Sequence, residues 1–163
     1  MDAAERDGVA DGTERTARAR VEALAEDMLF LDDWEDRYRY VIELGRALPP
    51  YPEDARDDAH KVRGCASQVW LSVRPDPAAD ASRPGDPVLR VAGDSDAHIV
   101  RGLVALVLAL QDGRRASMVA AEEPMALFER LGLATHLSAQ RANGLRSLVD
   151  RLRADARAAV VPS

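Results

Sequence analysis

The sequence predicts an α+β domain in which a small three-stranded antiparallel sheet packs against helices. Two observations carry this prediction. Segments with apolar residues at helical spacing occupy both ends of the chain, and short segments of alternating character lie together in the middle. Helices, then strands, then helices is an order typical of α+β folds. The 163 residues suit one domain, which we place at residues 14–163 after a polar tail at residues 1–13 that we expect to be disordered.

Two helices are expected before the strands. Apolar residues recur at helical spacing from Thr16 to Phe30, which predicts the first helix. Asp33 is a suitable N-cap for the second helix. We expect that helix to stop before Pro49 and Pro50, because a residue that precedes proline disfavours helical geometry.

Three short segments are expected to form the sheet. Apolar and polar residues alternate along residues 68–73, so one face of this strand is aliphatic. Residues 88–94 predict a second strand, and the short segment "HKVRG" at residues 60–64 predicts a third. Residues 75–87 are rich in Pro, Asp and Gly, which is typical of a loop.

The segment at residues 94–113 gives the clearest helical signal. Its apolar residues cover most sides of the helix, so we expect it to be the central buried helix. Asp94 or Ser95 is expected to cap its start, and Gly113 is expected to end it.

Two further helices are expected in the C-terminal part of the chain, near residues 124–131 and over about residues 139–158. The last is amphipathic, with its apolar residues on one face. Asn143 and Gly144 would ordinarily form a turn, which would delay the start of this helix until after Gly144.

Composition argues against several classes of function. The net charge is −6, and no basic stripe with interleaved aromatic residues is present, so we do not expect nucleic acid as a ligand. The longest apolar run, near residues 103–110, is too short to span a bilayer, and no secretory leader is recognisable. We therefore expect a cytoplasmic protein without membrane association, in which a single free thiol stays reduced.

Cys65 is the one cysteine of the chain and the main candidate for chemistry. Gly64 before it permits a tight backbone conformation. Ser67 and Gln68 put polar side chains where a purely structural strand would favour packing. Free cysteine also serves often as a small buried residue, and the residues alone leave that alternative open.

The charge around Cys65 bears on its reactivity. Lys61 and Arg63 are expected to stabilise the thiolate and so to lower the pKa of the thiol. A Cys–His hydrolase is a weaker alternative, because His60 lies five residues before the cysteine and is expected on the opposite face of a regular strand. His98 falls in the first turn of the central helix.

Metal and phosphate sites are not expected. One cysteine and three dispersed histidines show no metal-ligand spacing, and an all-cysteine iron–sulfur cluster needs about four thiolates. Gly93 stands alone before acidic and capping residues, which favours a simple turn over a phosphate-binding loop.

Arg141 lies at the expected start of the last helix, where the helix dipole mildly disfavours a cation. A solvated side chain or a local salt bridge would explain it without any function. Its unusual place is nevertheless a hint that it contacts something else.

Four segments together resemble one known family, and they occur here in that family's order. They are "LDDWEDRYRYVIELGRALPP", "KVRGCASQVWLSV", "GDSDAHIVRGLVALV" and "LGLATHLSAQRANGL". Over roughly residues 20–157 the chain resembles the SufE family of sulfur acceptors, which includes CsdE. The resemblance implies an α+β fold shared with IscU-type scaffolds. The long loop at residues 75–87 and the N-terminal tail depart from the family pattern without touching the motif, and the long loop leaves the choice of partner open.

The resemblance also implies a function. Cys65 matches the acceptor cysteine, which takes persulfide sulfur from a pyridoxal-phosphate cysteine desulfurase, activates that enzyme and passes sulfur to an iron–sulfur scaffold. Arg141 matches an arginine at the desulfurase contact, and Gly64, Ser67 and Gln68 are the supporting residues. No cofactor or metal is expected in this chain itself, and homodimer formation by the free protein is left open. The alternative is a binding module that activates the desulfurase allosterically while Cys65 is merely packed.

Overall fold

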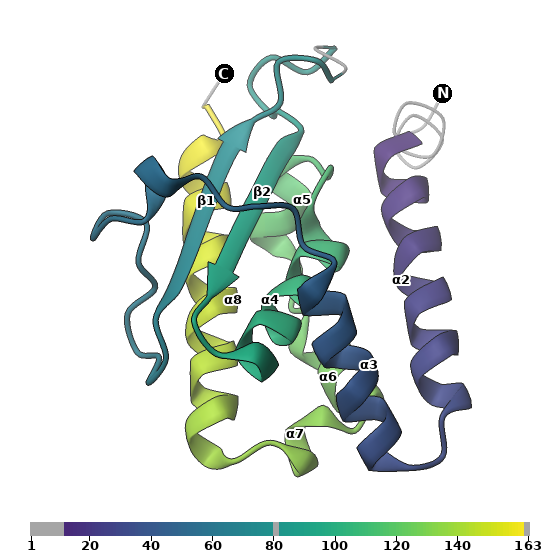
Figure 1. Cartoon of the computed structure of the whole chain (residues 1–163). Helices are drawn as coiled ribbons and strands as arrows, with labels where there is room; N and C mark the ends of the chain where they lie inside the picture. The colour runs from purple at the N-terminus through teal and green to yellow at the C-terminus, as the bar shows by residue number, and fades with distance from the viewer. Residues whose placement is uncertain (1–11, 80–81, 162–163) are drawn as a thin grey trace.

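The computed structural model describes residues 12–79 and 82–161, and its elements follow the predicted order of helices, strands and helices (Figure 1). They are α2 (Gly12–Phe30), α3 (Trp34–Arg46), a 3₁₀ turn (Glu53–Ala55), β1 (Val69–Pro75), β2 (Leu89–Ser95), α4 (His98–Gln111), α5 (Ala116–Ala121), α6 (Met125–Arg130), α7 (Leu133–His136) and α8 (Ala139–Ala159). The α+β prediction is confirmed. Residues 1–11 of the predicted tail lie outside the described residues, and Gly12 and Thr13 already belong to α2.

The sheet has two antiparallel strands, β1 and β2. Their register places Val69 opposite Ser95 and Pro75 opposite Leu89, so the strands pair along their whole length. Alternate residues are buried at the start of each strand, as expected for a sheet with one face on the core, and the last three residues of β2 are all buried.

The predicted third strand at residues 60–64 is wrong. This segment makes one isolated antiparallel bridge, with Lys61 opposite Trp70. Two hydrogen bonds flank the bridge: the N–H of Val62 donates to the carbonyl of Val69, and the N–H of Leu71 donates to the carbonyl of His60, both at 2.8 Å. Pairing stops there because the chain turns at Gly64, which has a φ of +90°.

Helix α4 is the central buried helix, as predicted. It packs against α3, β2 and α2, and in Figure 1 it lies behind α3 and the end of β2. Residues 102–108 are buried without interruption. The contact with α3 is close because two glycines meet there: a Cβ on Gly45 would lie 2.7 Å from the backbone nitrogen of Gly102.

The predicted cap of α4 is wrong, although its predicted end is confirmed. Pairing of β2 continues through Ser95, so Asp94 and Ser95 belong to the strand and Ala97 takes the N-cap position. The helix ends at Gln111, and Gly113 follows with a φ of +79°. The cap predicted for α3 is confirmed, since a carboxylate oxygen of Asp33 accepts from an N–H in the first turn at 2.9 Å.

Helix α8 begins at Ala139 and runs without a break through Gly144, so the turn considered at Asn143 and Gly144 is not formed. Ser138 caps the helix, because its hydroxyl oxygen accepts from the backbone N–H of Arg141 at 3.2 Å. The buried apolar face of α8 packs against β1 and α5. That packing holds the helix together across the Asn–Gly pair.

In the part of the chain that the structure describes, no helix combines the length and the apolar character needed to cross a membrane.

Candidate functional site

Cys65 lies in the loop that joins the isolated bridge to β1, and we call residues 63–68 the thiol loop. The thiol is half-buried and faces α8, where it donates to the carbonyl oxygen of Gly144 at an Sγ–O distance of 3.5 Å. A Cβ placed on Gly144 would lie 3.6 Å from the same sulfur. The thiol therefore rests close against the helix at Gly144, with room for no more than a methyl group between them.

Gly64 gives the thiol loop its shape. Its φ of +90° is a conformation that residues with a side chain rarely adopt. A Cβ at this position would also lie 2.5 Å from the hydroxyl oxygen of Ser147 on α8. Both the backbone angle and the close approach to α8 therefore require glycine next to the cysteine.

A pocket of about 380 Å³ opens beside the thiol between the thiol loop, α4 and α8. Its apolar lining comes from Val69, Val100, Leu103, Leu145 and Leu148, and its polar lining from Ser67, Ser138, Gln140 and Arg141. Of the residues predicted for the site, Cys65, Ser67 and Arg141 therefore meet around one pocket. Gln68 is not part of its lining.

Gln68 holds the downstream end of the thiol loop through its backbone. Its N–H donates to a carboxylate oxygen of Asp96 at 3.0 Å, and its carbonyl accepts from the hydroxyl of Ser95 at 2.8 Å. The side chain of Gln68 itself is exposed. The hydrogen bonds described between the thiol loop and other segments lie at Gln68 and at the thiol.

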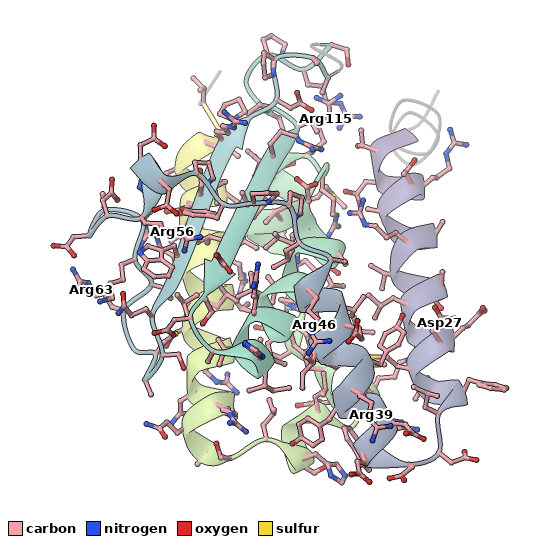
Figure 2. All side chains as sticks on the ribbon, viewed as in Figure 1. Asp27, Arg39, Arg46, Arg56, Arg63 and Arg115 are labelled. Atoms are coloured by element: carbon pink, nitrogen blue, oxygen red, sulfur yellow. The ribbon has the colours of Figure 1, made fainter. Side chains whose placement is uncertain are left out.

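Burial raises the pKa of the Cys65 thiol, so the predicted lowering by Lys61 and Arg63 is wrong for this conformation. The thiolate loses hydration in the half-buried site, which favours the neutral thiol. Figure 2 shows Arg63 extending outward from the edge of the molecule, and its side chain is exposed, so solvent screens its charge. The idle thiol is thus protonated at neutral pH.

We therefore expect Cys65 to react with iodoacetamide along a pH profile whose midpoint lies above about 8.5, the ordinary pKa of a cysteine. The thiolate is the reacting form, and the raised pKa moves its formation to higher pH. The rate of alkylation, followed by mass at a series of pH values, measures this midpoint. A midpoint below the ordinary value would show that basic neighbours dominate after all.

Arg141 lies in the first turn of α8 with an exposed side chain. Among the described residues, its guanidinium makes no hydrogen bond or ion pair, so the local salt bridge considered above is absent there. A free guanidinium at the rim of the thiol pocket is available for a contact with another molecule.

None of the residues described around the thiol pocket is a histidine. The ring of His60 bonds instead to Asp57, with 2.6 Å between Nδ1 and Oδ1, and the ring of His136 stacks on Trp34. The arrangement gives no support to a Cys–His hydrolase. Across the described ranges, no three His, Cys, Asp or Glu side chains are grouped so that they could hold a metal ion.

Sequence reasoning found Arg141 on α8 but missed the contacts of Gly144 and Ser147 with the thiol loop. Taken alone, Asn143 and Gly144 indicate a turn. Apolar residues at helical spacing continue after Gly144, and a capping residue, Ser138, precedes it. Together these signals indicate a helix with a glycine on a packed face.

Comparisons with known proteins point to one family. A model of the SufE family, described as an Fe–S metabolism associated domain, matches residues 22–156. A SufE-like protein of Rhizobium etli is 51% identical over 144 residues, which are 88% of this chain and 94% of the relative. A SufE-like protein of Rhizobium meliloti is 52% identical over 136 residues, with coverages of 83% and 94%.

A further relative is named for its function. The sulfur acceptor protein CsdE of Escherichia coli is 37% identical over 131 residues, which are 80% of this chain and 84% of that protein. The solution structure of a hypothetical protein from Thermus thermophilus matches with a TM-score of 0.67 at 19% identity, covering 86% of this chain and 95% of the other, and it supports the fold alone. With the family's pattern spanning most of its length, the chain belongs to the SufE family.

Proposed function

We propose that this chain is a sulfur acceptor: Cys65 takes sulfane sulfur from a cysteine desulfurase, the chain activates that enzyme, and the sulfur passes to a scaffold that assembles iron–sulfur clusters. The observation that carries the proposal is the single half-buried thiol beside a largely apolar pocket with a free arginine at its rim. Membership of the SufE family and similarity to a sulfur acceptor protein support it.

The chemistry is a thiol–persulfide exchange. The Cys65 thiolate attacks the outer sulfur of a persulfide on the desulfurase and forms a new S–S bond. The original S–S bond breaks, and the cysteine of the desulfurase leaves as a thiolate. No external oxidant or reductant is consumed, because the sulfane sulfur keeps its oxidation level as it moves between the two cysteines.

A single cysteine suits this task. A second thiol close to Cys65 would attack the persulfide, release its outer sulfur and close a disulfide. Cys65 is the one cysteine of the chain, so this loss within the molecule is impossible. The persulfide can therefore persist until another protein accepts its sulfur.

The pocket offers shelter for the persulfide. Its volume of about 380 Å³ is far larger than the about 30 Å³ that one water molecule occupies in the liquid, so an added sulfur atom fits. The apolar side chains of Val100, Leu103 and Leu148 limit access of water and of soluble reductants. To accept or to donate sulfur, the thiol leaves this site. The movement takes place between Gly64, whose φ is positive, and Gln68, whose backbone is hydrogen-bonded to Asp96.

The proposal is tested by following sulfur from radiolabelled cysteine. The desulfurase is incubated with labelled cysteine and this chain, and the products are separated on a non-reducing gel. We expect label on this chain, and we expect dithiothreitol to release it. Label confined to the desulfurase, with the two proteins shown to associate, would contradict the proposal.

A second candidate function is allosteric activation of the desulfurase with Cys65 as a packed residue. The contact of the thiol with Gly144 and its raised pKa favour this candidate, since both suit a buried neutral group. Replacement of the thiol by a hydroxyl separates the two candidates, because only a sulfur carrier needs a thiolate.

Arg141→Ala should weaken the activation of the desulfurase without weakening the fold. The exposed guanidinium makes no hydrogen bond or ion pair among the described residues, so its loss should change the melting temperature little. A lost charge-assisted contact with the partner should raise the concentration for half-maximal activation about tenfold, equivalent to about 1.4 kcal/mol. Titration of the desulfurase with each variant measures this concentration.

Arg146→Ala is the matched control, since Arg146 is also exposed on α8 but is not part of the pocket lining. We expect it to activate like the parent protein. Equal half-maximal concentrations for the two variants would mean that Arg141 has no special contact with the partner.

A further inference from the structure

One face of α8 contacts the chain segment that leads to the thiol at several points. Gly144, Ser147, Arg151 and Asp155 are spaced three and four residues apart, so they form one stripe along the helix. Cys65 rests on Gly144 and Gly64 approaches Ser147, while the two residues further along the stripe lie beside the chain upstream of the thiol. The stripe thus has a polar half that the thiol chemistry does not use.

Arg151 makes the contacts of that polar half. Its Nη1 donates to the carbonyl of Lys61 at 3.1 Å, and its Nη2 donates to the carbonyl of Ala59 at 2.6 Å. Its Nε lies 3.2 and 3.1 Å from the two carboxylate oxygens of Asp155. The carboxylate fixes the plane of the guanidinium, so its outer nitrogens face the two carbonyls.

The bridge to β1 explains why these two carbonyls need a donor. The carbonyl of His60 and the N–H of Val62 are used in pairing with β1. The carbonyl of Lys61 lies between these two groups and points to the edge away from β1, with which no described strand pairs. The carbonyl of Ala59 belongs to the turn just before the bridge. Arg151 supplies from α8 the donors for both carbonyls.

From these contacts we infer that Arg151 is a positioning residue for Cys65. It holds the residues just before the thiol loop on α8, as the hydrogen bonds of Gln68 hold the downstream end of the loop. Movement of the thiol away from Gly144 is then confined to the few residues between these two ends. The inference deepens the proposed function, on which it rests for the reason why the thiol moves.

Two variants test this role. Arg151→Met keeps most of the side-chain length but removes every donor, so the segment before the thiol loop keeps its bridge to β1 but loses its hold on α8. The thiol should then leave the pocket more often. We expect iodoacetamide to alkylate Cys65 about 3 to 10 times faster at a fixed pH than in the parent protein. Arg151→Lys keeps a charged donor for the carbonyls, and we expect it to restore a rate close to that of the parent.

Arg153→Met is the control, because Arg153 lies on the same helix and bonds to Ala120 and Glu123, away from the thiol loop. We expect its alkylation rate to equal that of the parent even if its melting temperature falls. An Arg151→Met rate equal to that of Arg153→Met would overturn the inference, since Arg151 would then contribute only to stability.

Asp155→Asn tests the same role of Arg151 if the Arg151→Met variant does not fold. This variant retains the guanidinium but loses the carboxylate that orients it. We expect faster alkylation of Cys65 again, and an unchanged rate would contradict the inference. The alkylation assay does not involve the desulfurase. If sulfur were not transferred to Cys65, the proposed function would be refuted, but the alkylation rates would still show whether Arg151 positions the thiol.

Titration of the desulfurase provides a second measurement, which would not change if Arg151 contributed only to stability. With Arg151→Met, we expect the concentration for half-maximal activation to rise several-fold, because the thiol loop is less well placed for docking. Turnover at saturation should be retained, because the docked loop still presents Cys65. Loss of turnover at saturation with an unchanged half-maximal concentration would contradict a positioning role.

Discussion

Cys65→Ser should leave a folded protein that still binds a cysteine desulfurase but no longer accelerates its turnover. A serine hydroxyl is not ionised at neutral pH and does not attack a persulfide sulfur, so the transfer step is lost. The hydroxyl is nearly the size of the thiol and can still donate to the carbonyl of Gly144. We therefore expect a cost in stability of at most about 1 kcal/mol.

Alanine production by the desulfurase, in the presence of a reductant, measures this effect at rising concentrations of each protein. Binding is measured alongside by pull-down, so a loss of rate is not confused with a loss of the complex. If the serine variant stimulates as well as the parent, the carrier role is wrong and allosteric activation takes its place.

Gly102→Ala should destabilise the fold by about 2 kcal/mol, at the upper end of the range for overpacking after the gain in helix propensity is subtracted. An added Cβ would overlap the backbone carbonyl of Val41 and lie 2.6 Å from its Cγ1, so α3 and α4 must separate. Overpacking of a core costs about 1–3 kcal/mol, and more where rigid backbone is displaced. The higher helix propensity of alanine offsets about 1 kcal/mol of that cost.

Urea unfolding measures this change, and Gly144→Ala is its control in another helix. A Cβ at Gly144 would meet Cys65 at 3.6 to 3.9 Å, which is ordinary contact. We expect this control to be neutral or to gain about 0.5–1 kcal/mol from helix propensity. An unfolding midpoint of Gly102→Ala equal to that of the parent would mean that α3 and α4 do not pack as described.

Local signals predicted much of the fold. The side chain of Asp33 itself supplies the oxygen that caps α3. The apolar residues on most sides of α4 predict its burial, whichever elements pack against it. The α+β class follows from the order of such segments. These features depend on residues that lie within a few turns of one another in the chain.

Features that depend on distant segments were not predictable in the same way. Whether residues 60–64 form a strand depends on how far β1 and the turn at Gly64 allow pairing. The pKa of Cys65 depends on burial against α8, whose Gly144 is 79 residues away in the chain. Arg151 likewise bonds to the carbonyl of Lys61, 90 residues away. The basic residues near Cys65 in the sequence, Lys61 and Arg63, therefore gave no indication that burial would raise its pKa.

The central claim is that Cys65 itself carries the sulfur, and mass spectrometry tests it most directly. The chain is incubated with a cysteine desulfurase, pyridoxal phosphate and cysteine, and its peptides are analysed without reduction. We predict a gain of one sulfur atom on the peptide that contains Cys65, lost again after treatment with a reductant. No added sulfur on that peptide, while the desulfurase is still stimulated, would contradict the account.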